Sequence, residues 1–266
     1  MEWYAAYLLL GAFVGFLAGL FGIGGGLLLV PVLSFLFEAQ HLTGPNNLHL
    51  LALGTSMSAI VLSAAFSAHT HHQHGAVNIG IVRTITPGLL FGTALGTLFA
   101  SHVSPIYLTG FFALFVYFAA LQMLFNLKPK AARQLPGRLA MTLVGTGIGA
   151  ISSLVSIGGG ALSVPFMLRH NIPLTQAIGT SAALGLPIAI GGTLGYIATG
   201  LTLNSLPANS LGFVYLPALF WVALASMLTT PLGAKATHRL PIKLLRRGFA
   251  VLLLALATKM LLKVLG

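Results

Sequence analysis

The sequence predicts an all-α polytopic membrane protein made of two inverted repeats, each a glycine-broken helical hairpin followed by three transmembrane helices. Three observations lead to this prediction. The mean hydropathy of the 266-residue chain is +0.97 and only 6% of its residues are charged, whereas about a quarter are charged in a soluble domain. Apolar runs long enough to span a bilayer follow one another along the chain. A triple-glycine segment also occurs twice, at equivalent places.

The composition excludes several classes of protein. With so few charges the chain cannot form a water-soluble surface, so its outer surface must face lipid. Thirteen Lys and Arg residues oppose two acids, Glu2 and Glu38. The basic residues lie in short gaps between apolar runs, which is typical of cytoplasmic membrane loops and not of a nucleic-acid-binding face. The chain has no cysteine, which excludes disulfides and thiolate metal sites.

Eight apolar regions are candidates for membrane helices, since a crossing helix needs about 20 apolar residues. Six uninterrupted runs qualify, namely 47–68, 80–101, 106–127, 174–199, 212–234 and 244–265. Two longer regions, 3–37 and 139–168, are interrupted by glycines. The first begins directly after Met1 and Glu2 with no basic segment before it, so we expect a retained membrane helix and not a signal peptide.

The glycine interruptions are part of an internal repeat. The segment 23–31 (IGGGLLLVP) matches 157–165 (IGGGALSVP) at an offset of 134. The segment 54–56 (GTS) likewise matches 179–181. The repeat predicts a first membrane repeat at 1–127, a basic cytoplasmic linker at 128–138 and a second membrane repeat at 139–266.

Loop charge predicts the orientation of these segments, because short loops rich in Lys and Arg stay in the cytoplasm. The basic loops are 69–83, 128–138, 169–170 and 235–247. All four share one side only if each glycine-broken region is a hairpin that returns to the side where it began. The two halves are then inverted and both termini lie outside. Region 139–168 offers about 15 residues for each leg, or about 22 Å of helix, so we expect both legs to be too short to cross and the glycine turn to lie at membrane depth.

The glycine turns and nearby hydroxyls are the candidate binding residues. Glycine lets a ligand approach the backbone, and a helix that starts after the turn offers free N–H groups and its positive dipole end to an anion. Two broken helices that meet near the midplane are a recurrent transporter design, although close packing or a hinge would also explain the glycines. The hydroxyls can donate to an oxyanion or bond to their own helix. The candidate substrate-binding residues are Gly24, Gly25, Gly26, Thr55, Ser56, Ser156, Gly158, Gly159, Gly160, Thr180 and Ser181.

Three other patterns have simpler explanations. Glycines spaced four apart, as in Gly11-x₃-Gly15 and Gly88-x₃-Gly92, predict close helix packing. The tract 69–74 (HTHHQH) leaves a transition-metal ion transporter as the alternative function, although a polar cytoplasmic loop explains it more simply. His49, at the mouth of an apolar run, is either a proton site or an interfacial residue.

Signatures of catalysis and of ATP-driven transport are absent from the sequence. It contains no Gly-x₄-Gly-Lys-Ser/Thr, no His-Glu-x-x-His and no nucleophile elbow. We therefore expect no enzyme, no catalytic residue, no cofactor and no metal site. The expected partners are a small anion and the lipid bilayer, without nucleic acid, and a homodimer stays open.

The same motifs resemble those of the sulfite exporter TauE/SafE family of bacterial membrane transporters. The residues that carry the resemblance are 19–26 (GLFGIGGG) through Pro31, their copy through Pro165, and the paired Gly-Thr-Ser segments. The resemblance implies a transporter of sulfite or of another small sulfur-containing or organic anion. We therefore expect a secondary transporter or facilitator that exports such an anion across the bacterial inner membrane. The second copy departs from the first by Ser153 for Gly19 and Ser156 for Gly22.

Overall fold

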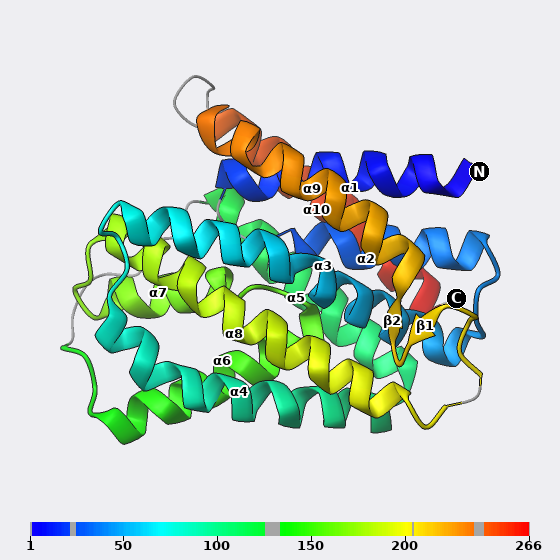
Figure 1. The fold of residues 1–266 in the computed structure, drawn as a ribbon, viewed down its shortest axis with the longest axis horizontal. Coiled ribbons are helices and arrows are strands. Elements are labelled where there is room, and N and C mark those ends of the chain that lie inside the picture. Colours follow the sequence, from blue (N-terminus) through cyan, green and yellow to red (C-terminus); the bar gives the residue numbers. More distant parts are fainter. Residues whose placement is uncertain (1, 22–24, 126–133, 204, 237–241, 266) are drawn as a thin grey trace.

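The computed structural model describes residues 2–21, 25–125, 134–203, 205–236 and 242–265, and within them the chain is almost entirely helical (Figure 1). The first half forms α1 (Glu2–Phe21), α2 (Gly26–Ala39), α3 (Pro45–Gln73), α4 (Ile79–His102) and α5 (Pro105–Phe125). The second half forms α6 (Arg138–Val155), α7 (Gly160–Arg169), α8 (Leu174–Gly200), α9 (Leu216–Ala236) and α10 (Ile242–Leu265). Two short antiparallel strands, β1 (Ser210–Leu211) and β2 (Val214–Tyr215), precede α9.

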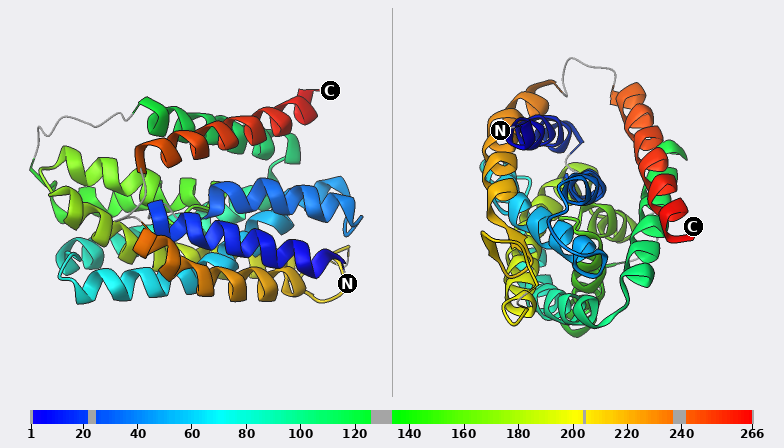
Figure 2. Two further views of the ribbon diagram at one scale, coloured as in Figure 1. Left: turned by 90° about the horizontal axis from the view of Figure 1, so that it is seen from above. Right: turned by 90° about the vertical axis from the view of Figure 1, so that its right-hand side faces the viewer.

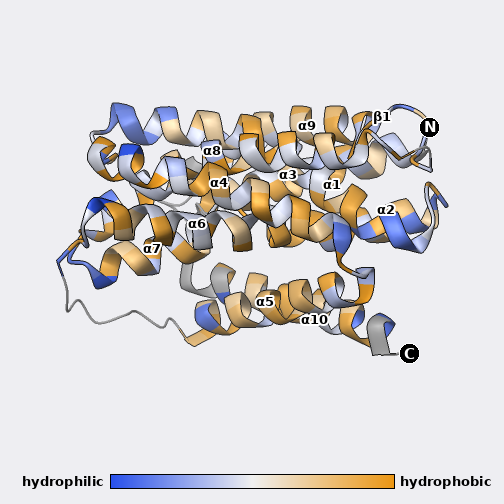
Figure 3. Ribbon diagram, turned by 90° about the horizontal axis from the view of Figure 1, so that it is seen from below, coloured by the Kyte–Doolittle hydropathy of each residue, from blue (hydrophilic) through white to orange (hydrophobic). Residues whose placement is uncertain are grey.

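The helices have the length and the surface of membrane helices. Seven of the described ones are long and apolar enough to cross a bilayer, namely α1, α3, α4, α5, α6, α8 and α9. Large apolar side chains such as Leu9, Phe91 and Phe99 are exposed on the outside. Figure 3 shows apolar colour along the helices and polar colour mainly at their ends. The chain is therefore a multi-pass α-helical membrane protein, as the sequence predicted and as expected of the bacterial inner membrane.

The prediction that both legs of the hairpin in region 139–168 are too short to cross is wrong. The first legs, α1 and α6, contain 20 and 18 residues and are candidate spans. Only the second legs are short, because α2 has 14 residues and α7 has 10, which correspond to about 21 Å and about 15 Å of helix. Each hairpin is therefore a full-length helix followed by a half-length helix that starts inside the bundle.

Glycine stripes hold the long helices together, as the four-residue spacing predicted. α1 packs along α9, and α4 packs along α6. A Cβ on Gly15 would lie 2.4 Å from Ser226 Cα, and a Cβ on Gly88 would lie 1.9 Å from Thr142 O. No side chain fits at such distances, so these helices touch through their backbones. In the order of the repeat, α1 corresponds to α6 and α4 corresponds to α9. The α1–α9 pair and the α4–α6 pair are therefore equivalent contacts between the two halves.

The two hairpins enter the bundle from opposite ends (Figure 1). α1 starts at the end where both termini lie, and α2 returns to it, whereas α6 starts at the opposite end and α7 returns there. The connections from α3 to α4 and from α7 to α8 lie at this opposite end, where α5 and α9 also finish. The predicted basic loops therefore share one end of the bundle, apart from residues 128–133 and 237–241, which lie outside the described residues. An inverted repeat requires this arrangement.

The orientation in the membrane stays a prediction, and it is tested by accessibility. A cysteine at Leu211, which is exposed in β1, should react with a membrane-impermeant maleimide added to intact cells, because loop 200–211 carries no Lys or Arg. A cysteine at Gln134 in the linker should react only after the cells are opened. The native chain has no cysteine, so each label reports one site. Labelling of both positions from outside would contradict the inverted arrangement.

Candidate functional site

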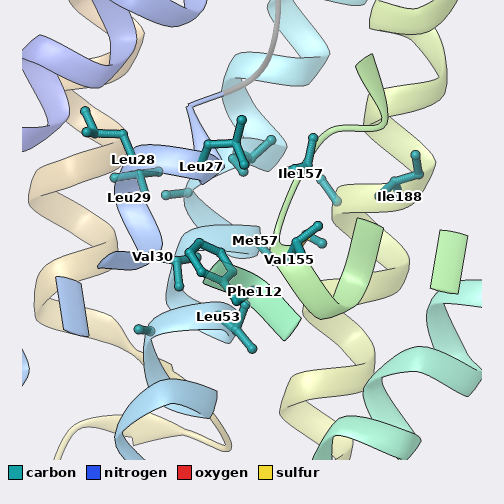
Figure 4. Close-up of a cluster of buried hydrophobic side chains, with 14 of the residues drawn as sticks. Leu27, Leu28, Leu29, Val30, Leu53, Met57, Phe112, Val155, Ile157 and Ile188 are labelled. Atoms are coloured by element: carbon teal, nitrogen blue, oxygen red, sulfur yellow. The ribbon is translucent and has the colours of Figure 1, made fainter. Parts of the chain in front are cut away.

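The two glycine breaks meet inside the bundle. A Cβ on Gly26, the first residue of α2, would lie 1.6 Å from Ser156 O, which follows α6. Ser156 has a left-handed backbone (φ 50°), as does Gly159 (φ 79°), and these two residues reverse the chain between α6 and α7. Figure 4 shows Leu27 of α2 and Ile157 of the second break within one cluster of buried side chains. The duplicated motifs are thus neighbours in space although 134 residues separate them in sequence.

Each break opens into the N-terminus of a half-length helix. The Leu29 N–H donates to Gly25 O, and the Ser163 N–H donates to Gly159 O, which are the first α-helical bonds of α2 and α7. The amides before them, at positions 26–27 and 160–161, are ones that a helix cannot satisfy from within. The positive dipole ends of α2 and α7 therefore lie at the breaks, beside the C-terminal end of α6 at Ser156. From the breaks, α2 and α7 run toward opposite ends of the bundle (Figure 1).

Several apolar side chains around the breaks are buried. Leu27, Ile60, Ile157 and Ile188 are each at most 3% exposed. Ile60 and Ile188 border the breaks directly, because a Cβ on Gly26 would meet Ile60 Cδ1 at 3.0 Å and one on Gly159 would meet Ile188 Cδ1 at 2.6 Å. In such a low-dielectric environment an N–H group interacts with an anion more strongly than it does in water.

The duplicated threonines join the two halves to each other. Thr55 Oγ1 on α3 accepts a hydrogen bond from the Tyr215 N–H (3.0 Å), and Thr180 Oγ1 on α8 accepts one from the Asn78 N–H (2.9 Å). Asn78 and Tyr215 occupy the same place after the repeated Gly-x-Val segments, so each half supplies the threonine and the other half supplies the amide. Both hydroxyls act as acceptors in these bonds, so each can still donate its own proton. Their bonds to the Asn78 and Tyr215 amides hold the segments that lead into α4 and α9.

Removal of either threonine hydroxyl should weaken this crossed connection. Thr55→Val and Thr180→Val keep the side-chain shape but leave a backbone N–H without its acceptor, so each should destabilise the protein by about 1–3 kcal/mol. The measurement is chemical denaturation in mixed micelles. Thr84→Val is the matched control, because Thr84 is partly exposed and its hydroxyl donates to Gly80 O of its own helix. Equal stability of all three variants would contradict the structural role of Thr55 and Thr180.

The candidate serines differ in their partners. Ser156 Oγ donates to Leu53 O on α3 at 3.3 Å, and Ser181 Oγ accepts from Ser163 Oγ at 2.7 Å. Ser163, which was not among the predicted site residues, thereby connects α7 to α8. Ser56 Oγ is buried and has no hydrogen-bond partner among the described residues. The candidate Gly24 lies outside the described residues.

The sequence predicted that the histidine tract lies in a loop. The tract lies instead on the last turns of α3, because this helix continues to Gln73. Its imidazoles are spread around the helix, and His74 follows as the C-cap, with its Nδ1 2.8 Å from Thr70 O. Among the residues that the structure describes, no group of three or more His, Cys, Asp and Glu side chains is arranged to hold a metal ion.

The chain is similar to known membrane proteins. Residues 7–260 match the family described as sulfite exporter TauE/SafE. A probable membrane transporter protein of Haemophilus influenzae is 38% identical over 96% of this chain and 97% of its own length. Probable membrane transporter proteins of Methanocaldococcus jannaschii (27% identical, 90% of this chain and 88% of its own) and of Bacillus subtilis (26% identical, 86% and 88%) are also similar. No solved structure matches the chain.

Proposed function

Because this chain belongs to the sulfite exporter TauE/SafE family, a family of membrane transporters, we propose that it is a secondary transporter or facilitator that exports sulfite or a related small anion across the inner membrane. The observation that supports the choice of an anion is the contact of the α2 N-terminus at Gly26 with the second break at Ser156, four residues before α7 begins, within an apolar interior. The candidate ligands are the amides of both breaks and the hydroxyls of Ser56 and Ser181, because Ser156 Oγ already donates its proton to Leu53 O.

Electrostatics favours an anion over a cation at this place. Removal of an ion from water into a protein interior costs several kcal/mol, which the site must offset. Each helix N-terminus supplies about half a positive charge, so two termini together approximate one cation. Of the chain's two acids, Glu2 and Glu38, neither lies in a central part of an apolar run, so a cation would find no carboxylate there. Relative motion of the two repeats would then expose the site to one side at a time.

Transport by purified protein in liposomes tests the proposal. Protein-containing vesicles are loaded with sulfite, sulfate, sulfoacetate or acetate. They should release at least one of these anions faster than protein-free vesicles loaded with the same anion. A variant in which His69, His71, His72 and His74 are all replaced by Gln should release the anion at the same rate, because these side chains lie at a helix end away from the breaks. Release of none of the anions, together with movement of a divalent metal ion that this variant loses, would replace the proposal by the metal-transport alternative.

A further inference from the structure

A cavity of about 550 Å³ lies away from the glycine breaks, and we call it the terminal cavity. It is bounded by the end of α2, the starts of α3 and α5, and the end of α10, at the end of the bundle where both termini lie. α5 and α10 pack on each other along one side of the molecule (Figure 2), and the terminal cavity opens where this pair meets α2 and α3. None of the candidate site residues lines it.

Two buried polar side chains in its wall have no partner. His49 and Ser34 are 4% and 6% exposed, and both line the terminal cavity. Neither His49 Nε2 nor Ser34 Oγ has a hydrogen-bond partner within the described ranges. A buried polar atom without a partner costs about 1–3 kcal/mol, so an acceptor that reached both atoms from the cavity would relieve this cost. Both atoms are able to donate, His49 in the tautomer that carries its proton on Nε2.

The charges around the terminal cavity favour an anion. Lys263 and Glu38 form an ion pair at its rim, each side chain about half exposed. The Lys259 ammonium lies 4.3 Å from the ring centre of Phe35, which also lines the terminal cavity. Two ammonium groups thus oppose one carboxylate, and that carboxylate already has a partner. A cation would meet this excess positive charge, whereas an anion would gain from it.

We propose that the terminal cavity is a second anion site, which binds a small oxyanion through His49 Nε2 and Ser34 Oγ, with Lys263 in its lining as a counter-charge. Its volume lies within the range of ligand pockets and leaves room for a small anion and several waters. If the chain transports an anion as proposed, the terminal cavity would be the vestibule on the side of the termini. Only this role rests on the proposed function. Binding itself is tested without transport.

A single reporter cysteine measures occupancy of the terminal cavity, since the native chain has none. Thr109→Cys puts the reporter in the cavity wall, and Ser104→Cys puts the control on the exposed surface at the same end. In lipid-free detergent, sulfate or methanesulfonate should slow maleimide labelling of Thr109→Cys at least threefold relative to chloride of equal ionic strength. The same anions should leave Ser104→Cys unchanged. Thr43→Cys serves as a second reporter in the same wall.

Added substitutions assign the protection to the named atoms. Ser34→Ala and His49→Leu should each remove it, and Lys263→Gln should weaken it. Arg247→Gln, which changes the net charge equally at the other end of α10, should not. Equal labelling rates in sulfate and chloride, or protection that survives both Ser34→Ala and His49→Leu, would overturn the proposal. Protection by phosphatidylglycerol in nanodiscs without protection by either free anion would also overturn it, because the terminal cavity would then hold a lipid headgroup.

A variant of the glycine break separates this site from the proposed function. In Gly158→Ala protein, where we expect transport to fail, the anions should still protect Thr109→Cys. Loss of protection in that variant would show that the terminal cavity is not an independent site. Protection without transport of any anion by unaltered protein would leave the terminal cavity standing and remove the proposed function.

Discussion

Gly158→Ala should lower anion transport in liposomes at least tenfold while the protein remains folded. A Cβ at this position would meet nothing nearer than Gly185 Cα at 3.8 Å and Ile60 Cγ2 at 3.9 Å, which are ordinary contacts. The methyl group would nevertheless stand beside the amides that follow in the second break, where close approach of an anion to the backbone is required. Loss of one hydrogen bond to a charged ligand is worth about 1.5–3 kcal/mol, or roughly 10- to 150-fold.

The matched control is Gly147→Ala, in α6 of the same hairpin. No heavy atom lies within 4 Å of a Cβ at Gly147, so this change adds a methyl group away from the break. It should transport like the unaltered protein. If Gly158→Ala does so too, while both variants are monodisperse, the glycine breaks serve only helix packing and the anion crosses elsewhere.

Gly26→Ala should prevent stable assembly of the two halves. The added Cβ would lie 1.6 Å from Ser156 O and 2.8 Å from Ser156 C, so the start of α2 and the end of α6 would have to separate. Backbone atoms on both sides leave no flexible side chain to move away, and the expected loss is more than about 4 kcal/mol, a size that marks a disrupted core. The measurement is the yield of monodisperse protein after detergent extraction, followed by chemical denaturation.

Gly110→Ala in α5 is the control for this change. A Cβ there meets no heavy atom within 4 Å, and alanine is favoured over glycine in a helix interior by about 0.5–1 kcal/mol. The control should therefore be at least as stable as the native protein. Equal stability of Gly26→Ala and Gly110→Ala would contradict the contact between the two breaks.

Local sequence features were enough to predict the class of the protein and most of its helices. Charge content and apolar run length are sums over local residues, and they correctly predicted the multi-pass helical fold, with helix ends within a few residues for α4, α5, α8 and α10. Four-residue glycine spacing correctly predicted the packing surfaces of α1 and α4, because side-chain direction in a helix follows from position alone. The loop predicted at the histidine tract was wrong because polar residues were taken to end the helix. α3 continues through them to Gln73.

Which residues meet in space depends on how the helices pack, and local sequence features did not predict it. Run length could not divide the broken regions correctly, since the chain reverses where Ser156 and Gly159 adopt left-handed backbones and not at the middle of the apolar run. The sequence also could not show that Thr55 binds the amide of Tyr215, or that His49 and Ser34 share a cavity with the end of α10. The physical reason is the same in each case. Periodicity and composition record what one segment prefers, whereas these sites are made by atoms from segments far apart in the chain, whose approach depends on how all the helices pack together.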